Sequence, residues 1–205
     1  MLRAILATFV MLCAGGPATA GDSIGGVSRL QGFSSGKLDG TIEILRIDSS
    51  VFQQQIVSTG PTSRLEVTFA DGTLLTLGEN AEMTLDRFVY DPAGGTAELK
   101  LGVVGAFRFI TGQASKLASA DIAVTTPVAT VGIRGTDFWG GPIDDQALGV
   151  LLIDGAVSVS NAAGEQILDT PGQGTNIISP GDAPGPVTFW PQDKADRAFA
   201  TVTFQ

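Results

Sequence analysis

Carboxylates are the side chains of this sequence that could carry chemistry on their own. The chain has 21 acidic residues, 12 basic residues and no histidine, for a formal net charge of −9. Two carboxylates can serve as the acid and base of a hydrolase, and they can come from any two parts of a chain. Asp144 and Asp145 are adjacent, and Asp86 lies near Asp91. None of these acids has the Asp-x-Asp-x-Asp-Gly spacing of a calcium loop. We therefore expect solvated loop acids, with a carboxylate-based hydrolase as the enzyme-class alternative.

Residue types exclude most other catalytic and cofactor chemistry. Cys13 is the only cysteine, and it lies in a segment that we expect to be removed. Without histidine or a mature cysteine there is no His-based triad, thiol nucleophile or zinc–thiolate site. The glycine-rich residues 172–174 lack the Lys-Ser/Thr and the helix that a phosphate-binding loop needs. We expect no cofactor, no metal and no catalytic residue, so the chain is not predicted to be an enzyme.

The N-terminal segment has the features of a secretory signal. Arg3 precedes eleven apolar or small residues at 4–14, and residues 18–20 have the small-x-small form of a cleavage site. This apolar run is shorter than the roughly 20 residues that span a bilayer. We expect cleavage between Ala20 and Gly21, a periplasmic or secreted protein, and no membrane span in the mature chain. An acidic chain without a basic cluster is repelled by phosphates, so we expect no nucleic-acid partner.

The elements that must position the side chains are predicted to be short strands. Val, Ile, Thr and Phe recur between 27 glycines and 10 prolines, a composition that favours strands and turns over helix. Alternation over 97–111 predicts a strand that splits near 102–105, and Pro127 should lie at a strand start, an edge or a corner. Further strands are predicted at 41–47, 51–57, 122–126, 128–133, 167–168, 176–178 and 200–204. One short helix is predicted at 193–199.

This pattern predicts one all-β domain. We expect a signal peptide over 1–20, a Gly/Ser-rich irregular lead-in over 21–40, a β domain over 41–179 and a Pro/Gly-rich C-terminal segment over 180–205. Many short strands, almost no helix and no strict repeat are typical of a β-sandwich or a short irregular β-solenoid.

Two Asp-Gly pairs predict two different turns. If residues 70–72 form a three-residue loop with Gly72 left-handed, Val67 faces Leu75 and one face of the hairpin over 65–77 is apolar. At Asp154-Gly155, a two-residue loop would place Leu152 opposite Val157, again on an apolar face. We therefore predict a hairpin with a type I′ turn there.

An ordered set of motifs resembles a known family. The set comprises the strand, Asp-Gly turn and strand at 63–77, the Leu-x-x-Gly segment at 99–105, Thr-Pro through Ile-Arg-Gly-Thr-Asp-Phe at 126–138, the strand with Asp-Gly and Val-x-Val at 150–159, and Leu-x-x-x-Gly at 168–172. Over 65–160 the chain resembles the FecR domain, a periplasmic module described as solenoid-like β. The motif residues that we expect to be structural are Asp71, Gly72, Thr126, Pro127, Arg134, Gly135, Thr136, Phe138 and Gly155.

The resemblance also implies a class of function. Classical FecR proteins are iron-uptake sensors with a cytoplasmic anti-sigma segment, one transmembrane helix and a periplasmic FecR domain, which receives a signal from an outer-membrane TonB-dependent transporter. This sequence shows neither a cytoplasmic segment nor an internal span. We therefore expect a stand-alone exported FecR module.

Three residues are candidates for partner binding. Arg134 could contact a partner or hold an anion, but we expect a partly buried arginine that donates to backbone carbonyls at the Gly135 turn. Phe138 and Trp139 could form an aromatic platform or pack in the core, and both interpretations stay open.

We predict a non-enzymatic envelope or extracellular protein that acts through protein–protein contact, with a partner of unknown identity. Strand edges and residues 138–142 are the expected contact surfaces. The alternative is an extracellular carbohydrate-binding or adhesion module that uses Trp139 or Trp190.

Overall fold

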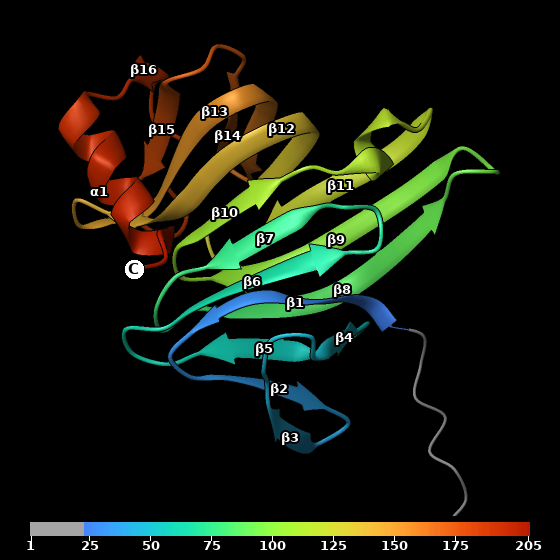
Figure 1. The fold of residues 1–205 in the computed structure, drawn as a ribbon. Helices are drawn as coiled ribbons and strands as arrows, with labels where there is room; N and C mark the ends of the chain where they lie inside the picture. Colours follow the sequence, from blue (N-terminus) through green and yellow to red (C-terminus); the bar gives the residue numbers. More distant parts are fainter. Residues whose placement is uncertain (1–22) are drawn as a thin grey trace, which may run out of the picture.

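The computed structural model describes residues 23–205. The expected signal peptide and its cleavage site at Ala20 and Gly21 lie outside the described residues. The described chain forms one large curled sheet, and a single α-helix, α1 (Gln192–Val202), packs against it at the C-terminal end (Figure 1). No helix in this part of the chain is both long and apolar enough to cross a membrane. The all-β prediction is confirmed, and the sheet curls into a half-barrel.

The sheet is built from sixteen strands. They are β1 (Ser23–Gln31), β2 (Ser34–Leu38), β3 (Thr41–Ile44), β4 (Ser50–Phe52), β5 (Ile56–Thr59), β6 (Arg64–Phe69), β7 (Leu74–Leu77), β8 (Glu82–Asp91), β9 (Thr96–Val104), β10 (Phe107–Ile110), β11 (Ser119–Thr125), β12 (Thr130–Ile143), β13 (Gln146–Asn161), β14 (Gly164–Leu168), β15 (Gln173–Ile177) and β16 (Thr188–Phe189). A 3₁₀ turn, η1 (Gln113–Lys116), lies between β10 and β11.

The curl arises because two arms of the sheet begin at different parts of one long strand, β12. The first part of β12 pairs with β11, and its later part pairs with β10. The first arm runs β10-β7-β6-β1-β4, and the second arm runs β11-β9-β8-β5-β2-β3. The opposite edge of β12 pairs with β13, which also pairs with β14 and β15. A short turn joins β4 to β5, so the arms are also connected away from β12.

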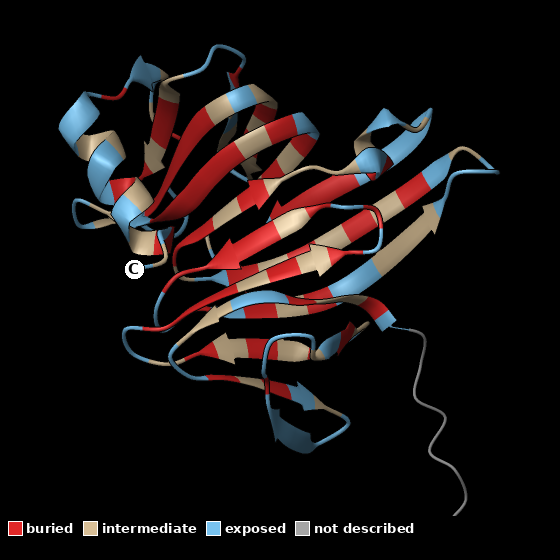
Figure 2. Ribbon diagram, viewed as in Figure 1, coloured by how far each residue is buried: buried red, intermediate tan, exposed pale blue. Residues whose placement is uncertain are grey.

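The main core lies between the two arms. Alternate residues of β9, of β6 from Leu65 onward and of the first half of β8 are buried, and Figure 2 shows this banding along β9; β7 is buried over its last three residues. Phe69 of the first arm stacks on Phe88 of the second, with ring centroids 5.8 Å apart. Packing of this kind requires one apolar face on each arm, which is the period-2 pattern of the sequence.

Several sequence predictions are confirmed. The hairpin over 65–77 has the predicted register, with Val67 opposite Leu75, and Gly72 is left-handed at φ 83°. The strand over 97–111 splits into β9 and β10 on either side of Gly105. Pro127 lies in the turn between β11 and β12.

Other predictions are wrong. The expected irregular lead-in over 21–40 contains β1 and β2, because the sheet supplies partners for this glycine-rich segment on both sides. The strand predicted at 200–204 does not form, since α1 continues to Val202. Strand β8 is not evident from the sequence pattern, because a register shift between Leu85 and Arg87 breaks its alternation.

The hairpin predicted at Asp154-Gly155 is also wrong. β13 continues through both residues as one strand from Gln146 to Asn161. Leu152 lies opposite Phe138, and Val157 lies opposite Ile133, so both apolar residues pair with β12 and not with each other. Gly155 nonetheless has φ 82°.

A smaller core forms where α1 covers the sheet. Its buried residues are Ala106, Trp139, Leu151, Trp190, Ala198 and Val202. Trp139 donates from Nε1 to Thr201 Oγ1 at 3.0 Å, which ties β12 to the last turn of the helix. The helix prediction at 193–199 is confirmed, and the helix extends beyond both predicted ends.

Candidate functional site

Arg134-Gly135-Thr136, the centre of the sequence signature, lies at a bulge between β12 and β13. Arg134 lies opposite Ala156, and the next pair in the ladder is Asp137 with Asp154, so two residues of β12 face one of β13. Gly135 and Gly155 both have positive φ, at 57° and 82°. A β-carbon on Gly155 would overlap the carbonyl oxygen of Gly135. The two glycines therefore let the backbones approach closely at the bulge.

Thr136 fixes the bulge from the buried side. Its hydroxyl donates to the carbonyl oxygen of Ala156 at 2.6 Å, and its backbone N–H donates to Thr111 Oγ1 at 2.6 Å. Thr111 in turn donates its N–H to the carbonyl of Thr136 at 2.9 Å. These bonds satisfy backbone groups that the ladder leaves unpaired at the bulge, so Thr136 has a structural role.

Asp71 has a similar structural role in the β6–β7 turn. Its buried carboxylate accepts from the N–H of Thr73 at 3.0 Å, from the hydroxyl of Thr73 at 2.7 Å and from the N–H of Ala114 at 3.1 Å. These bonds tie the turn to η1. Thr126, next to Pro127, accepts from the N–H of Ala129 at 3.1 Å and closes the turn before β12.

Arg134 is exposed, and the prediction of a partly buried arginine bonded to backbone carbonyls is wrong. Ile133 faces the core, so the next residue of the strand points to the opposite face. Within residues 23–205 the Arg134 guanidinium makes no hydrogen bond and no ion pair. It lines a surface hollow of about 460 Å³.

We call this hollow the outer trough. The small residues that line it, Gly132, Ala156 and Ser158, are half-buried, and we call them its floor. The exposed residues that line it, Asp121, Arg134, Glu165 and Ile167, we call its rim. Asp121 is engaged by a salt bridge from Lys100. Ile167 is 61% exposed, whereas most large apolar residues of the neighbouring strands are buried.

Phe138 and Trp139 do not form a surface platform. Both side chains are 0% exposed, Phe138 in the main core and Trp139 beneath α1. Phe138 meets the rings of Phe107 and Phe109, and Trp139 meets Trp190 edge to face at 6.0 Å. Of the three partner-binding candidates, only Arg134 is exposed.

Comparisons with known proteins agree with this architecture. The model of the family described as FecR protein matches residues 55–158, which is half of the chain. The chain belongs to the FecR family. The matched region runs from near the start of β5 into β13 and includes the whole bulge. No curated protein sequence matches the chain.

Two solved structures share the fold. Both are of a candidate anti-sigma factor from Parabacteroides distasonis, at 2.50 Å and 1.65 Å resolution. They match with TM-scores of 0.55 and 0.54 and sequence identities of 19% and 18%. The alignment covers 69% of this chain and 62% of each of those chains, which is less than two thirds of their length.

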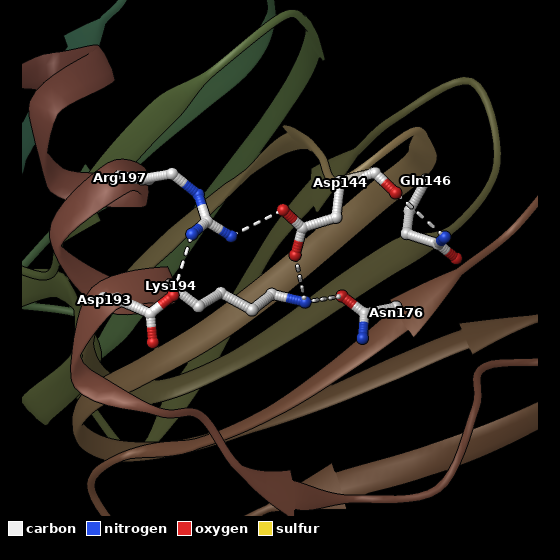
Figure 3. Close-up of polar contacts among 6 residues, drawn as sticks. All are labelled: Asp144, Gln146, Asn176, Asp193, Lys194 and Arg197. Carbon is white, nitrogen blue, oxygen red and sulfur yellow. Dashed lines mark hydrogen bonds and ion pairs between the residues drawn. The ribbon is translucent and has the colours of Figure 1, made fainter.

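Asp144, in the β12–β13 turn, is paired and not simply solvated as the sequence predicted (Figure 3). It accepts from Arg197 at 2.6 Å and from Lys194 at 3.2 Å, so it anchors the start of α1 to the β12–β13 turn. Partial loss of hydration by itself raises the pKa of Asp144. The hydrogen bonds and positive charges of Arg197 and Lys194 outweigh it and hold the pKa below the ordinary value of 3.8.

The remaining acids do not assemble into a metal site. Asp86 and Asp91 are exposed on β8, and Asp91 accepts from the N–H of Gly94 at 2.8 Å. Among residues 23–205, no three potential ligands from His, Cys, Asp and Glu lie close enough together to hold an ion.

The FecR match leaves out an exposed sheet edge, β3. β3 pairs with β2 on one side and with no other strand in the described chain. Ile42, Ile44 and Ile47 are 68%, 56% and 57% exposed along and just after this strand. Ile42 and Ile44 are two positions apart in one strand and so share one face. This spacing is the sequence feature from which the apolar surface could have been predicted.

Proposed function

We propose that this FecR-family chain is an exported, non-catalytic module that binds another protein of the bacterial envelope or the extracellular space. The observation that carries this proposal is the β3 edge with its three exposed isoleucines. Contiguous exposed apolar side chains mark interaction sites in many soluble proteins. An open edge strand can also receive an extended segment of a partner through main-chain hydrogen bonds.

The rest of the fold supports a binding role. The signature residues Asp71, Thr126 and Thr136 hold turns and the bulge in place through buried hydrogen bonds. Family membership points in the same direction, because FecR and anti-sigma proteins are generally not enzymes. The structural relatives are described as a candidate anti-sigma factor, a class defined by binding another protein.

The carbohydrate-binding alternative has less support. A sugar platform needs an aromatic face that a ligand can reach. Trp139 is fully buried, and Trp190 is 8% exposed beneath the Lys194 ammonium, whose nitrogen lies 4.1 Å from the ring centroid.

Photocrosslinking in the periplasm tests the proposal. A photoreactive residue placed at Ile44 should yield an adduct to another protein, whereas the same residue at Asp193, exposed on α1, should not. The substitution Ile42→Lys should abolish the Ile44 adduct, because a charge replaces half of the apolar face. Equal labelling at both positions, or adducts to glycan alone, would contradict the proposal. Mass spectrometry of the adducts distinguishes these outcomes.

A further inference from the structure

We infer that two copies of this chain associate face to face through the outer trough. This inference goes beyond the proposed function and does not depend on it, because the trough lies on β12, β13 and β14 and not on the β3 edge.

The sheet register places opposite charges at opposite ends of the trough. Ser158 of β13 lies opposite Gly132 of β12 and Ile167 of β14. Arg134 lies two residues from Gly132, in the row of Ala156. Glu165 lies two residues from Ile167 in the other direction, in the row of Ser160. Strand spacing puts the two charged residues about 16 Å apart, with Ser158 at the midpoint.

A two-fold axis near Ser158 makes this arrangement complementary to itself. An axis in the plane of the interface, perpendicular to the line from Arg134 to Glu165, exchanges their positions. Each Arg134 then faces Glu165 of the second copy, which gives two ion pairs related by symmetry. Such an interface is isologous, with the same patch used by both copies.

The sizes of the side chains in the trough also fit this two-fold arrangement. Gly132, Ala156 and Ser158 keep its floor low, and Ile167 stands exposed beside them. The same axis carries each Ile167 over Ala156 and Ser158 of the other copy. Association would therefore bury an apolar side chain against small residues and remove it from water.

The two charged side chains that would pair across the dimer, Arg134 and Glu165, have no ion-pair partner within the described chain. Asp121, by contrast, is engaged by Lys100. The formal charge of −9 on each copy opposes association at long range. Physiological salt screens that repulsion beyond about 8 Å, and close ion pairs are screened less. We therefore expect a dimer that strengthens when salt rises from very low to physiological concentration.

Sedimentation equilibrium over a protein concentration series at physiological salt tests the inference. The wild type should show a monomer–dimer equilibrium. Arg134→Glu and Glu165→Arg should each weaken the dimer at least about tenfold. The double variant Arg134→Glu with Glu165→Arg should restore it. Arg46→Glu, an equal charge change at an exposed position outside the trough, and Ile42→Lys on β3 should leave it unchanged.

A wild type that stays monomeric across the series would overturn the inference. So would single reversals without effect, or a double variant as weak as the singles. Thermal melting of each variant reports whether it folds. If a reversal lowers the melting temperature, Arg134→Gln and Glu165→Gln replace it, and each should also weaken the dimer.

Discussion

The carbonyl oxygen of Gly135 occupies the space that a β-carbon on Gly155 would need. The two glycines belong to neighbouring strands, and both have positive φ at the same bulge. The bulge interrupts the longest ladder of the sheet close to where β12 passes from one arm to the other. The close approach of two backbones is therefore part of how the two arms are joined.

Gly155→Ala should destabilise the protein strongly. The alanine would adopt a left-handed conformation and would also clash with the backbone of Gly135, at a combined cost of about 2–5 kcal/mol. Gly72→Ala is the matched control, because Gly72 has φ 83° with no atom near its hypothetical β-carbon. We expect that control to lose about 1–2 kcal/mol from strain alone. Denaturant unfolding measures both, and equal losses would contradict the clash.

Thr136→Val should remove one buried hydrogen bond without changing side-chain volume much. The carbonyl of Ala156 would lose the donor that lies 2.6 Å away. An unsatisfied buried acceptor costs about 1–3 kcal/mol in the free energy of unfolding. Thr125→Val, at an exposed position of β11, is the control and should change stability little. Similar unfolding midpoints for the two variants would argue against the role assigned to Thr136.

The docking of α1 should depend on the ionisation of Asp144. Its pKa is lowered in the folded protein, so its contribution is present above the ordinary value of 3.8 and is lost as pH falls through the folded value. Tryptophan fluorescence should follow this change, because Lys194 stacks on Trp190. Asp144→Asn should perturb the fluorescence already at neutral pH.

Asp145→Asn serves as the control for this titration. Asp145 occupies the same turn but takes part in no ion pair of the described chain. Its variant should reproduce the wild-type fluorescence between pH 3 and pH 7. An Asp144→Asn protein with an unchanged pH profile would show that the ion pairs with Lys194 and Arg197 do not hold the helix.

Export makes a separate prediction. Expression in a Gram-negative host should give a periplasmic or secreted protein whose N-terminal residue is Gly21, because residues 18–20 have the form of a cleavage site. Intact-mass spectrometry of the purified protein measures this directly. Ala20→Arg should block processing, and retention of residues 1–20 in the wild type would contradict the prediction.

Local sequence patterns were enough to predict the register where the two strands that flank a turn pair with each other. The register of Val67 with Leu75 followed from alternation together with the left-handed Gly72. The signature motifs also indicated the family, and the family match covers the same region. In these segments the deciding contacts lie within a few residues of one another.

Prediction failed where the deciding contact is distant in sequence. Asp154-Gly155 has the composition of a turn, but its positive φ serves a contact with Gly135, twenty residues earlier. The Arg134 side chain points to solvent because it alternates with the buried Ile133 along β12. The residue types of the motif do not reveal which of the two faces the core. Phe138 and Trp139 are buried on opposite faces of one strand, because α1 covers the second face.

The order of the strands along the chain has a kinetic consequence. Up to β11 the chain passes repeatedly between the two arms, so neither arm is built from consecutive strands alone, and both arms attach to β12. A fold with many strand pairings distant in sequence folds slowly. Closing each long loop costs conformational entropy before the stabilising contacts form. When the chain is synthesised from its N-terminus, the edges of β10 and β11 stay unpaired until residues 130–143 are available to form β12. Copies that are still folding therefore expose these edges to one another during that interval, and unpaired strand edges favour aggregation.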